Sequence, residues 1–135
     1  MEKDTKISTR QKLSTLWIGV MFFYVYADIK CFFETGMIEK IMTGNIEGII
    51  IGQPLLFWGA VLMSIPVFML FFSLILPHKI CKYLNIILAS AHILLAMAVL
   101  TVGTEAWAYY YYYTALEIAV HVMIIFYSVR WKLEK

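Results

Sequence analysis

Apolar residues occur along the chain in long blocks, and polar residues gather between them. Four such blocks stand out, at residues 13–33, 54–76, 83–102 and 107–129. A helix that rises about 1.5 Å per residue needs about 20 residues to cross a hydrocarbon core about 30 Å thick. The pattern therefore predicts four membrane-spanning helices in a single transmembrane domain, residues 1–135.

The segments between the blocks predict how the helices are ordered. Residues 77–82 and 103–106 are short connections, which join antiparallel neighbours. We therefore expect an all-α fold, an integral membrane four-helix up-down bundle. The loop after the first helix, residues 34–53, is longer, and Met37–Thr43 within it has the apolar spacing of a short interfacial helix. Two interpretations of this loop stay open: a segment lying flat in the headgroups, or a lid over the bundle.

The composition agrees with a membrane protein. Hydrophobic residues make up 62% of the chain and charged residues 15%, whereas a soluble domain has about 45–50% and about 25%. Within the four blocks the charged residues are Asp28, Lys30 and Glu117. Lys30 and Glu34 are four residues apart, which predicts an interfacial ion pair. Asp28 and Glu117 need another explanation.

The distribution of Lys and Arg predicts the orientation. Nine lie on the side that holds both termini and residues 77–82, and two, Lys30 and Lys40, lie on the other side. Because cytoplasmic loops carry the excess of basic residues, both termini should face the cytoplasm from the cell inner (plasma) membrane. The net charge of +2 reflects this bias and gives no indication of a nucleic-acid partner.

Counting residues from the membrane boundaries gives each polar side chain a depth. Glu117 should lie near the midplane, roughly 15 Å from the start of its helix. His92 on the third helix should lie at a similar depth, and His121 one turn closer to the cytoplasm. Asp28 should lie near the outer boundary, with Tyr24 one turn beneath it. An acid facing lipid would cost about 2.5–3.5 kcal/mol, so these groups should face the bundle interior.

A proline in the second helix adds to this prediction. Pro66 lacks an N–H group and leaves the carbonyl of Leu62 without its helical partner. A kink opposite Glu117 would make room for a ligand. Glu117 with His121 and His92 could also be considered as metal ligands, but the Glu-x-x-His spacing is absent and carboxylates are too few. We therefore expect no metal and no cofactor.

These residues favour a polar intramembrane pocket that binds or conveys a small lipophilic or cationic molecule. Glu117 would supply the counter-charge, His121 and His92 its proton partners, and Asp28 with Tyr24 the upper gate. The first alternative is a membrane enzyme in which Glu117 and His121 perform acid–base chemistry on a lipid-soluble substrate; the non-enzymatic interpretation is preferred, and no catalytic residues are assigned. The second is a structural or accessory subunit whose polar residues only hold helices together. Membrane lipid is the expected partner, and a homodimer stays among the expectations because transport usually requires a dimer or a repeat.

Three stretches also carry a resemblance: "KLSTLWIGVMFFYVYADIKCFF", "SIPVFMLFFSLILP" and "ALEIAVHVMIIFYSVRW". Through them the chain resembles an uncharacterised family of small prokaryotic four-helix membrane proteins that are DoxX-like in layout. The resemblance implies a helical inner-membrane protein and supplies no established activity. The residues that it highlights are Tyr24, Asp28, Pro66, Glu117 and His121.

Overall fold

The structure, a computed structural model, describes residues 6–101 and 107–132. Within these residues the chain forms four long helices, one short helix and two short strands. In chain order they are α1 (Thr9–Cys31), α2 (Met37–Met42), β1 (Asn45–Ile46), β2 (Ile49–Ile50), α3 (Gln53–Ile75), α4 (His78–Val99) and α5 (Ala108–Arg130). The predicted long helices and the predicted short helix are therefore confirmed. The expected connection at residues 103–106 lies outside the described residues.

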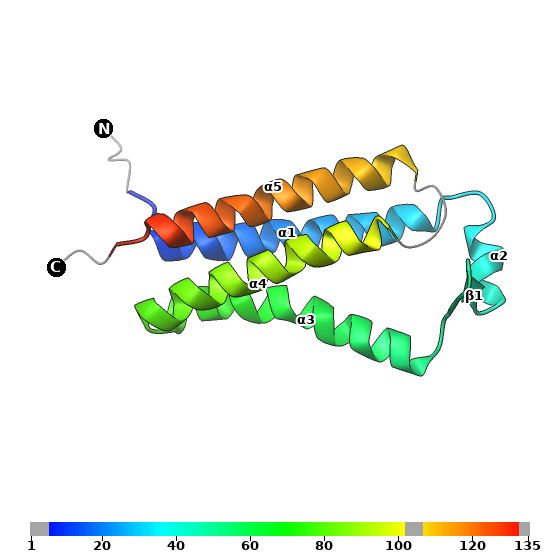
Figure 1. The fold of residues 1–135 in the computed structure, drawn as a ribbon, viewed down its shortest axis with the longest axis horizontal. Helices are drawn as coiled ribbons and strands as arrows, with labels where there is room; N and C mark the ends of the chain where they lie inside the picture. Colours follow the sequence, from blue (N-terminus) through cyan, green and yellow to red (C-terminus); the bar gives the residue numbers. More distant parts are fainter. Residues whose placement is uncertain (1–5, 102–106, 133–135) are drawn as a thin grey trace, which may run out of the picture.

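The long helices run up and down beside one another (Figure 1). α1 packs against both α3 and α5, and α4 packs against α5, whereas α3 and α4 have few contacts. α1 begins and α5 ends at one end of the bundle, here called the terminal end, while α2 and the strands lie at the other end, the loop end (Figure 1). The arrangement is the predicted up-down bundle, but one of its four sides is loosely packed.

Two helices begin earlier than the apolar blocks predicted. Ser8 and Gln11 form a capping box, in which the Ser8 hydroxyl accepts from the Gln11 N–H and the Gln11 side chain accepts from the Ser8 N–H. This cap starts α1 at Thr9, within a polar segment. α4 starts at His78, directly after Pro77, rather than at residue 83. Its first turn is polar, so hydropathy alone assigned that turn to the connection.

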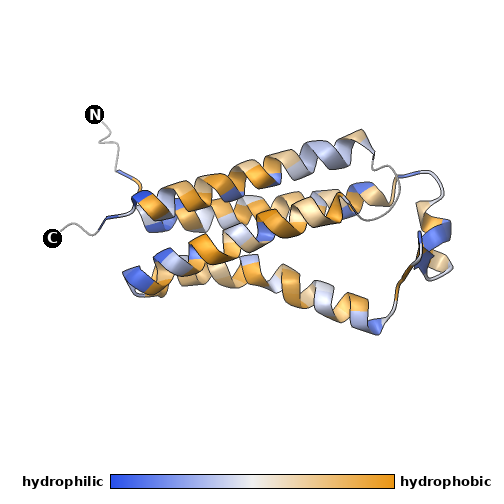
Figure 2. Ribbon diagram, viewed as in Figure 1, coloured by the Kyte–Doolittle hydropathy of each residue, from blue (hydrophilic) through white to orange (hydrophobic). Residues whose placement is uncertain are grey.

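Three of the described helices, α3, α4 and α5, are long and apolar enough to cross a membrane. α1 is equally long, but its first turns carry Arg10 and Lys12. α1 packs along α3 and α5, so it lies at the same depth in the membrane as these two helices. Apolar residues cover the long helices between their ends, and polar residues gather at the helix ends and in α2 (Figure 2). The chain is a multi-pass helical membrane protein.

The loop after α1 contains a hairpin that the sequence analysis did not predict. β1 and β2 pair antiparallel through a tight turn in which Glu47 and Gly48 have φ values of 52° and 91°. Two successive positive φ angles are typical of the hairpin turn that favours glycine. The Asn45 side chain accepts a hydrogen bond from the Gly48 N–H at 2.8 Å and closes the turn.

This loop forms a small unit beyond the loop end of the bundle (Figure 1). α2 packs chiefly against β1, and Lys40 forms an ion pair with Glu47 at 3.2 Å. The predicted Lys30–Glu34 ion pair is wrong, because Glu34 instead accepts a hydrogen bond from the Tyr109 hydroxyl at 2.6 Å. No described residue of the loop lines the cavity presented below.

The tightly packed core lies toward the terminal end. We call residues 6–20, 66–91 and 120–132 the terminal half, and residues 21–65, 92–101 and 107–119 the loop half. The buried apolar cluster lies wholly in the terminal half and consists of Leu13, Trp17, Val20, Met69, Ala89 and Ile124. At the terminal end Arg10 donates to the Leu76 carbonyl at 2.7 Å, and Lys82 donates to the Val129 carbonyl at 3.0 Å. Both contacts join one helix to the end of another.

Candidate functional site: a carboxyl-lined cavity in the loop half

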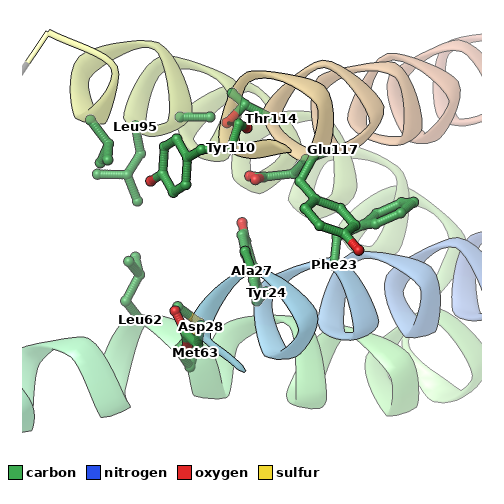
Figure 3. Close-up of a pocket in the computed structure, with 13 residues that line it drawn as sticks. Phe23, Tyr24, Ala27, Asp28, Leu62, Met63, Leu95, Tyr110, Thr114 and Glu117 are labelled. Atoms are coloured by element: carbon green, nitrogen blue, oxygen red, sulfur yellow. Dashed lines mark hydrogen bonds between the residues drawn. The ribbon is translucent and has the colours of Figure 1, made fainter. Parts of the chain in front are cut away.

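A cavity of about 130 Å³ lies in the loop half, between all four long helices. Its polar lining comes from α1 and α5 and consists of Tyr24, Asp28, Tyr110, Tyr113, Thr114 and Glu117. α3 and α4 supply an apolar wall that includes Leu62, Met63 and Leu95. Figure 3 shows these side chains converging from the different helices. The cavity therefore has a polar side and an apolar side.

The course of α3 accounts for the space. Pro66 is buried inside α3 and removes the hydrogen bond to the Leu62 carbonyl four residues earlier. Beyond this point α3 swings away from α4 toward the loop end (Figure 1). Leu62 and Met63 stand just beyond the proline and line the cavity. The sequence prediction that Pro66 makes room opposite Glu117 agrees with this geometry.

The cavity is acidic. Glu117 and Asp28 contribute carboxyl groups, and none of the described lining residues carries a basic side chain. The Thr114 hydroxyl is already used, because it donates to the Tyr110 carbonyl at 2.9 Å. The groups left to meet a ligand are the two carboxyls and the hydroxyls of Tyr110 and Tyr113. Such a set is complementary to a cation or to a hydrogen-bond donor.

Tyr24 connects the cavity to the core. Its hydroxyl lies 2.6 Å from Nδ1 of His92. The same hydroxyl points toward the Glu117 carboxyl (Figure 3). Tyr24 therefore lies between Glu117, which lines the cavity, and His92, which does not.

The two histidines lie beneath the cavity rather than in its wall. His92 and His121 are only 2% and 0% exposed, and their rings stack with centroids 5.3 Å apart. Both rings contact the edge or face of Trp17, with centroids 5.9 Å and 5.6 Å from its ring. Trp17 is held by its own hydrogen bond to the Asn85 side chain, at 2.7 Å. The two imidazoles are therefore held against Trp17, at the side of the buried core that is nearest the cavity.

The predicted site residues therefore separate into two groups. Glu117, Asp28 and Tyr24 line the cavity, whereas His92 and His121 do not. The sequence analysis did not identify Trp17 as the support of both histidines. Its place on the same helical face as Tyr24, seven residues apart, was the available signal. The described part of the chain contains no cluster of three or more His, Cys, Asp or Glu side chains placed to hold a metal ion.

The helices and the cavity define a multi-pass membrane protein with acidic groups inside its bundle. The model of a family of unknown function, DUF6326, matches residues 2–135, and the chain belongs to this family. No curated protein and no solved structure matches the chain.

Proposed function

We propose that this membrane protein binds a small amphiphilic cation in the loop-half cavity, with Glu117 as the counter-charge. The observation that carries the proposal is the lining: two carboxyls and several tyrosine hydroxyls face an apolar wall, and the described lining holds no basic group. An acid inside a membrane bundle is costly to retain, and such residues usually serve a substrate, ion or proton. An ammonium group would offset the charge of Glu117 directly.

The size of the cavity limits what it can hold. About 130 Å³ is well below the roughly 300–1,000 Å³ of sites that enclose drug-sized ligands. The space suits an ammonium head group with a few carbons. A longer molecule must therefore leave part of itself outside the cavity.

The loosely packed side supports an exit for an apolar tail. α3 and α4 have few contacts, and the apolar wall lies on this side. Met63 and Val99 in that wall are 38% and 41% exposed. In a bilayer these surfaces face hydrocarbon, so an alkyl tail could extend into lipid while its head remains beside Glu117. Access from within the bilayer would favour lipophilic amines over water-soluble ones.

The orientation belongs to the same proposal. The Lys and Arg bias favours the terminal end as the cytoplasmic end, in the inner membrane of a DoxX-like bundle. The cavity would then open toward the outer half of the bilayer. Because the terminal half is tightly packed, we expect the ligand to bind in the loop half alone. Passage across the membrane would then require a second conformation or a homodimer.

A membrane enzyme is the second candidate, and one contact favours it. The Tyr24 hydroxyl reaches both Glu117 and His92, which is an arrangement able to give and accept protons at the cavity wall. The acid–base pair would then be Glu117 with Tyr24 rather than Glu117 with His121. Turnover of a lipid-soluble substrate would separate this candidate from simple binding.

Thermal unfolding in detergent with three eight-carbon probes tests the proposal. Octylammonium should stabilise the wild type, whereas octanol and octanoate at the same concentration should have little effect, because a ligand stabilises only the state that binds it. Glu117→Gln should weaken octylammonium binding at least tenfold, about 1.4 kcal/mol, and leave the unliganded fold nearly as stable. Glu34→Gln is the matched control, since Glu34 lies outside the cavity, and it should behave as wild type.

Two results would contradict the proposal. One is equal stabilisation of the wild type by octanol and octylammonium, which would indicate general partitioning of the alkyl chain. The other is unchanged octylammonium binding in Glu117→Gln. In that case the polar residues would hold helices together and serve no ligand.

A further inference from the structure

The described residues contain a row of three polar side chains, Glu117, Tyr24 and His92, that leads from the cavity into the core. Its first member is the Glu117 carboxyl, which the Tyr24 hydroxyl faces (Figure 3). The same Tyr24 hydroxyl lies 2.6 Å from Nδ1 of His92, which is the third member. A hydroxyl has one proton and can accept as well as donate. Tyr24 can therefore donate to Glu117 or to His92, but not to both at once.

The partners of Tyr24 must adjust to whichever direction it takes. When Glu117 is protonated it can donate to the Tyr24 oxygen, and Tyr24 then donates to Nδ1 of His92. The imidazole then carries its proton on Nε2. When Glu117 is ionised it accepts from Tyr24, and Nδ1 of His92 must carry a proton to donate to the Tyr24 oxygen. The tautomer of His92 therefore follows the protonation state of Glu117.

His121 constrains the other side of His92. Its Nδ1 lies 2.9 Å from the Glu117 backbone carbonyl, which can only accept. Nδ1 of a neutral His121 therefore carries the proton, and its Nε2 holds a lone pair. The Nε2 atoms of both histidines are buried and have no hydrogen-bond partner among the described residues. Buried polar nitrogens without partners are rare, and these two lie in stacked rings at the end of the row.

We infer that Glu117, Tyr24 and His92 form a proton relay between the cavity and the core. In its first step the Glu117 O–H bond breaks, its proton joins the Tyr24 oxygen, and the former Tyr24 proton forms an N–H bond at Nδ1 of His92. The products are a carboxylate, an intact tyrosine and an imidazolium, with no net change in charge. In the second step a water molecule that reaches the buried Nε2 of His92 accepts its proton and becomes hydronium, and His92 is left neutral with its proton on Nδ1.

The relay extends the proposed function and names how the site would be regulated. A cation entering the cavity favours the ionised form of Glu117, and the displaced proton would then leave through His92 instead of returning to the cavity. Binding of the cation and release of a proton would be coupled one to one. This use rests on the proposed function, whereas the relay itself can be tested without any ligand.

Few other groups in the described structure lie close enough to affect the protonation of Glu117 or His92. Asp28 from α1, with Tyr110 and Tyr113 from α5, share the cavity with Glu117. Around His92 the neighbouring groups are Tyr24 and Trp17 from α1 and His121 from α5. Gln53–Ile75, the whole of α3, contains no titratable residue. Asp28 is thus the competing carboxyl, and Asp28→Asn serves as a control.

The test is a nitrogen-15 NMR titration of histidine-labelled full-length protein in nanodiscs, because the ring nitrogens report the tautomer directly. Carbon-13 labelling of glutamate follows Glu117 in the same samples. Between about pH 4 and 10, a range that spans ordinary and strongly shifted carboxyl groups, His92 should change from the Nε2–H to the Nδ1–H form as Glu117 ionises. The two signals should share one midpoint, as expected for coupled sites, and His121 should keep its Nδ1–H form.

Four variants make the result specific. Tyr24→Phe should separate the two signals, so that His92 no longer follows Glu117, and Glu117→Gln should leave His92 in one tautomer throughout. Tyr26→Phe is the matched control, because Tyr26 lies on the same helix but is 51% exposed and does not line the cavity. Tyr26→Phe and Asp28→Asn should retain the shared midpoint.

Several outcomes would overturn the relay. They are ionisation of Glu117 without a change at His92, absence of any Glu117 titration in this range, or an unchanged shared midpoint in Tyr24→Phe. Failure of octylammonium binding would instead contradict the proposed function and leave the shared midpoint in place. The two inferences therefore fail in distinguishable ways.

Discussion

The two halves of the bundle use polar residues in different ways. In the terminal half the side chains of Trp17 and Asn85 hydrogen bond to each other, and Asn85 also donates to the Cys81 carbonyl at 2.8 Å. In the loop half Glu117 and Asp28 line a cavity and leave oxygen atoms available to a ligand. Both sets occur in helices of similar apolarity. A polar residue in a membrane bundle is therefore a better candidate for binding a ligand when it has oxygen or nitrogen atoms that are free to hydrogen bond. The depth of the residue in the membrane is less informative about such a role.

Packing differs in parallel with the hydrogen bonds. The buried apolar cluster belongs to the terminal half, where α1 fits closely against α3 and α5. In the loop half α3 departs from α4, and Phe57 and Trp58 are 61% and 67% exposed. Between the halves lie the stacked imidazoles of His92 and His121. The molecule thus combines a closely packed terminal half with a more open loop half, and the proposed relay lies where they meet.

The largest expected effect tests this contrast with two tryptophans. Trp17→Ala should destabilise the protein by about 3–5 kcal/mol, because it leaves a cavity beside both histidines and removes the N–H that donates to Oδ1 of Asn85. Trp58→Ala, on the exposed face of α3, should cost much less. The free energy of unfolding in mixed micelles measures both. Similar losses for the two variants would remove the distinction between a packed and an open half.

A smaller effect on stability is expected where the halves meet on α3. Pro66→Ala restores an N–H to the Leu62 carbonyl and should straighten the helix, with a change in unfolding free energy within about 1 kcal/mol. A bend of about 20° acting over the nine residues to Phe57, roughly 13 Å of helix, displaces that position by ~4 Å. Spin labels at Phe57 and Met97, both exposed, should therefore move closer together by about that distance.

Octylammonium binding to Pro66→Ala tests whether the course of α3 also matters for ligand binding. A straightened α3 should fill part of the cavity with Leu62 and Met63, so binding should weaken together with the shorter label distance. An unchanged distance would mean that packing against α1, rather than the proline, sets the course of α3. A shorter distance with unchanged binding would place the ligand outside this cavity.

Much of the fold could be predicted from the sequence because membrane helices leave a simple pattern. The apolar blocks predicted the four long helices to within a few residues, except where local chemistry extends them. The Ser8 capping box lengthens α1, and the turn after Pro77 begins α4 within polar residues. The hairpin was missed because each of its strands has two residues, too few for a periodic pattern.

The residues that line the cavity could be predicted in part, and their arrangement could not. Depth and helical faces brought together Glu117, Tyr24 and Asp28, which do line one cavity. They could not separate these residues from His92 and His121, because that separation depends on where α3 leaves the bundle. The change in packing occurs within about one helical turn, and a count of residues along isolated helices does not resolve it.

Photolabelling with an octylamine that carries a diazirine in its tail tests the central claim most directly. If Glu117 holds the amine head, mass spectrometry should find labels on the apolar wall, at Leu62, Met63 and Leu95, in the wild type. These labels should disappear in Glu117→Gln, while labels on Phe57 and Trp58, which face lipid in either case, should persist. Labelling confined to those two exposed residues, or an identical pattern in both proteins, would contradict the account.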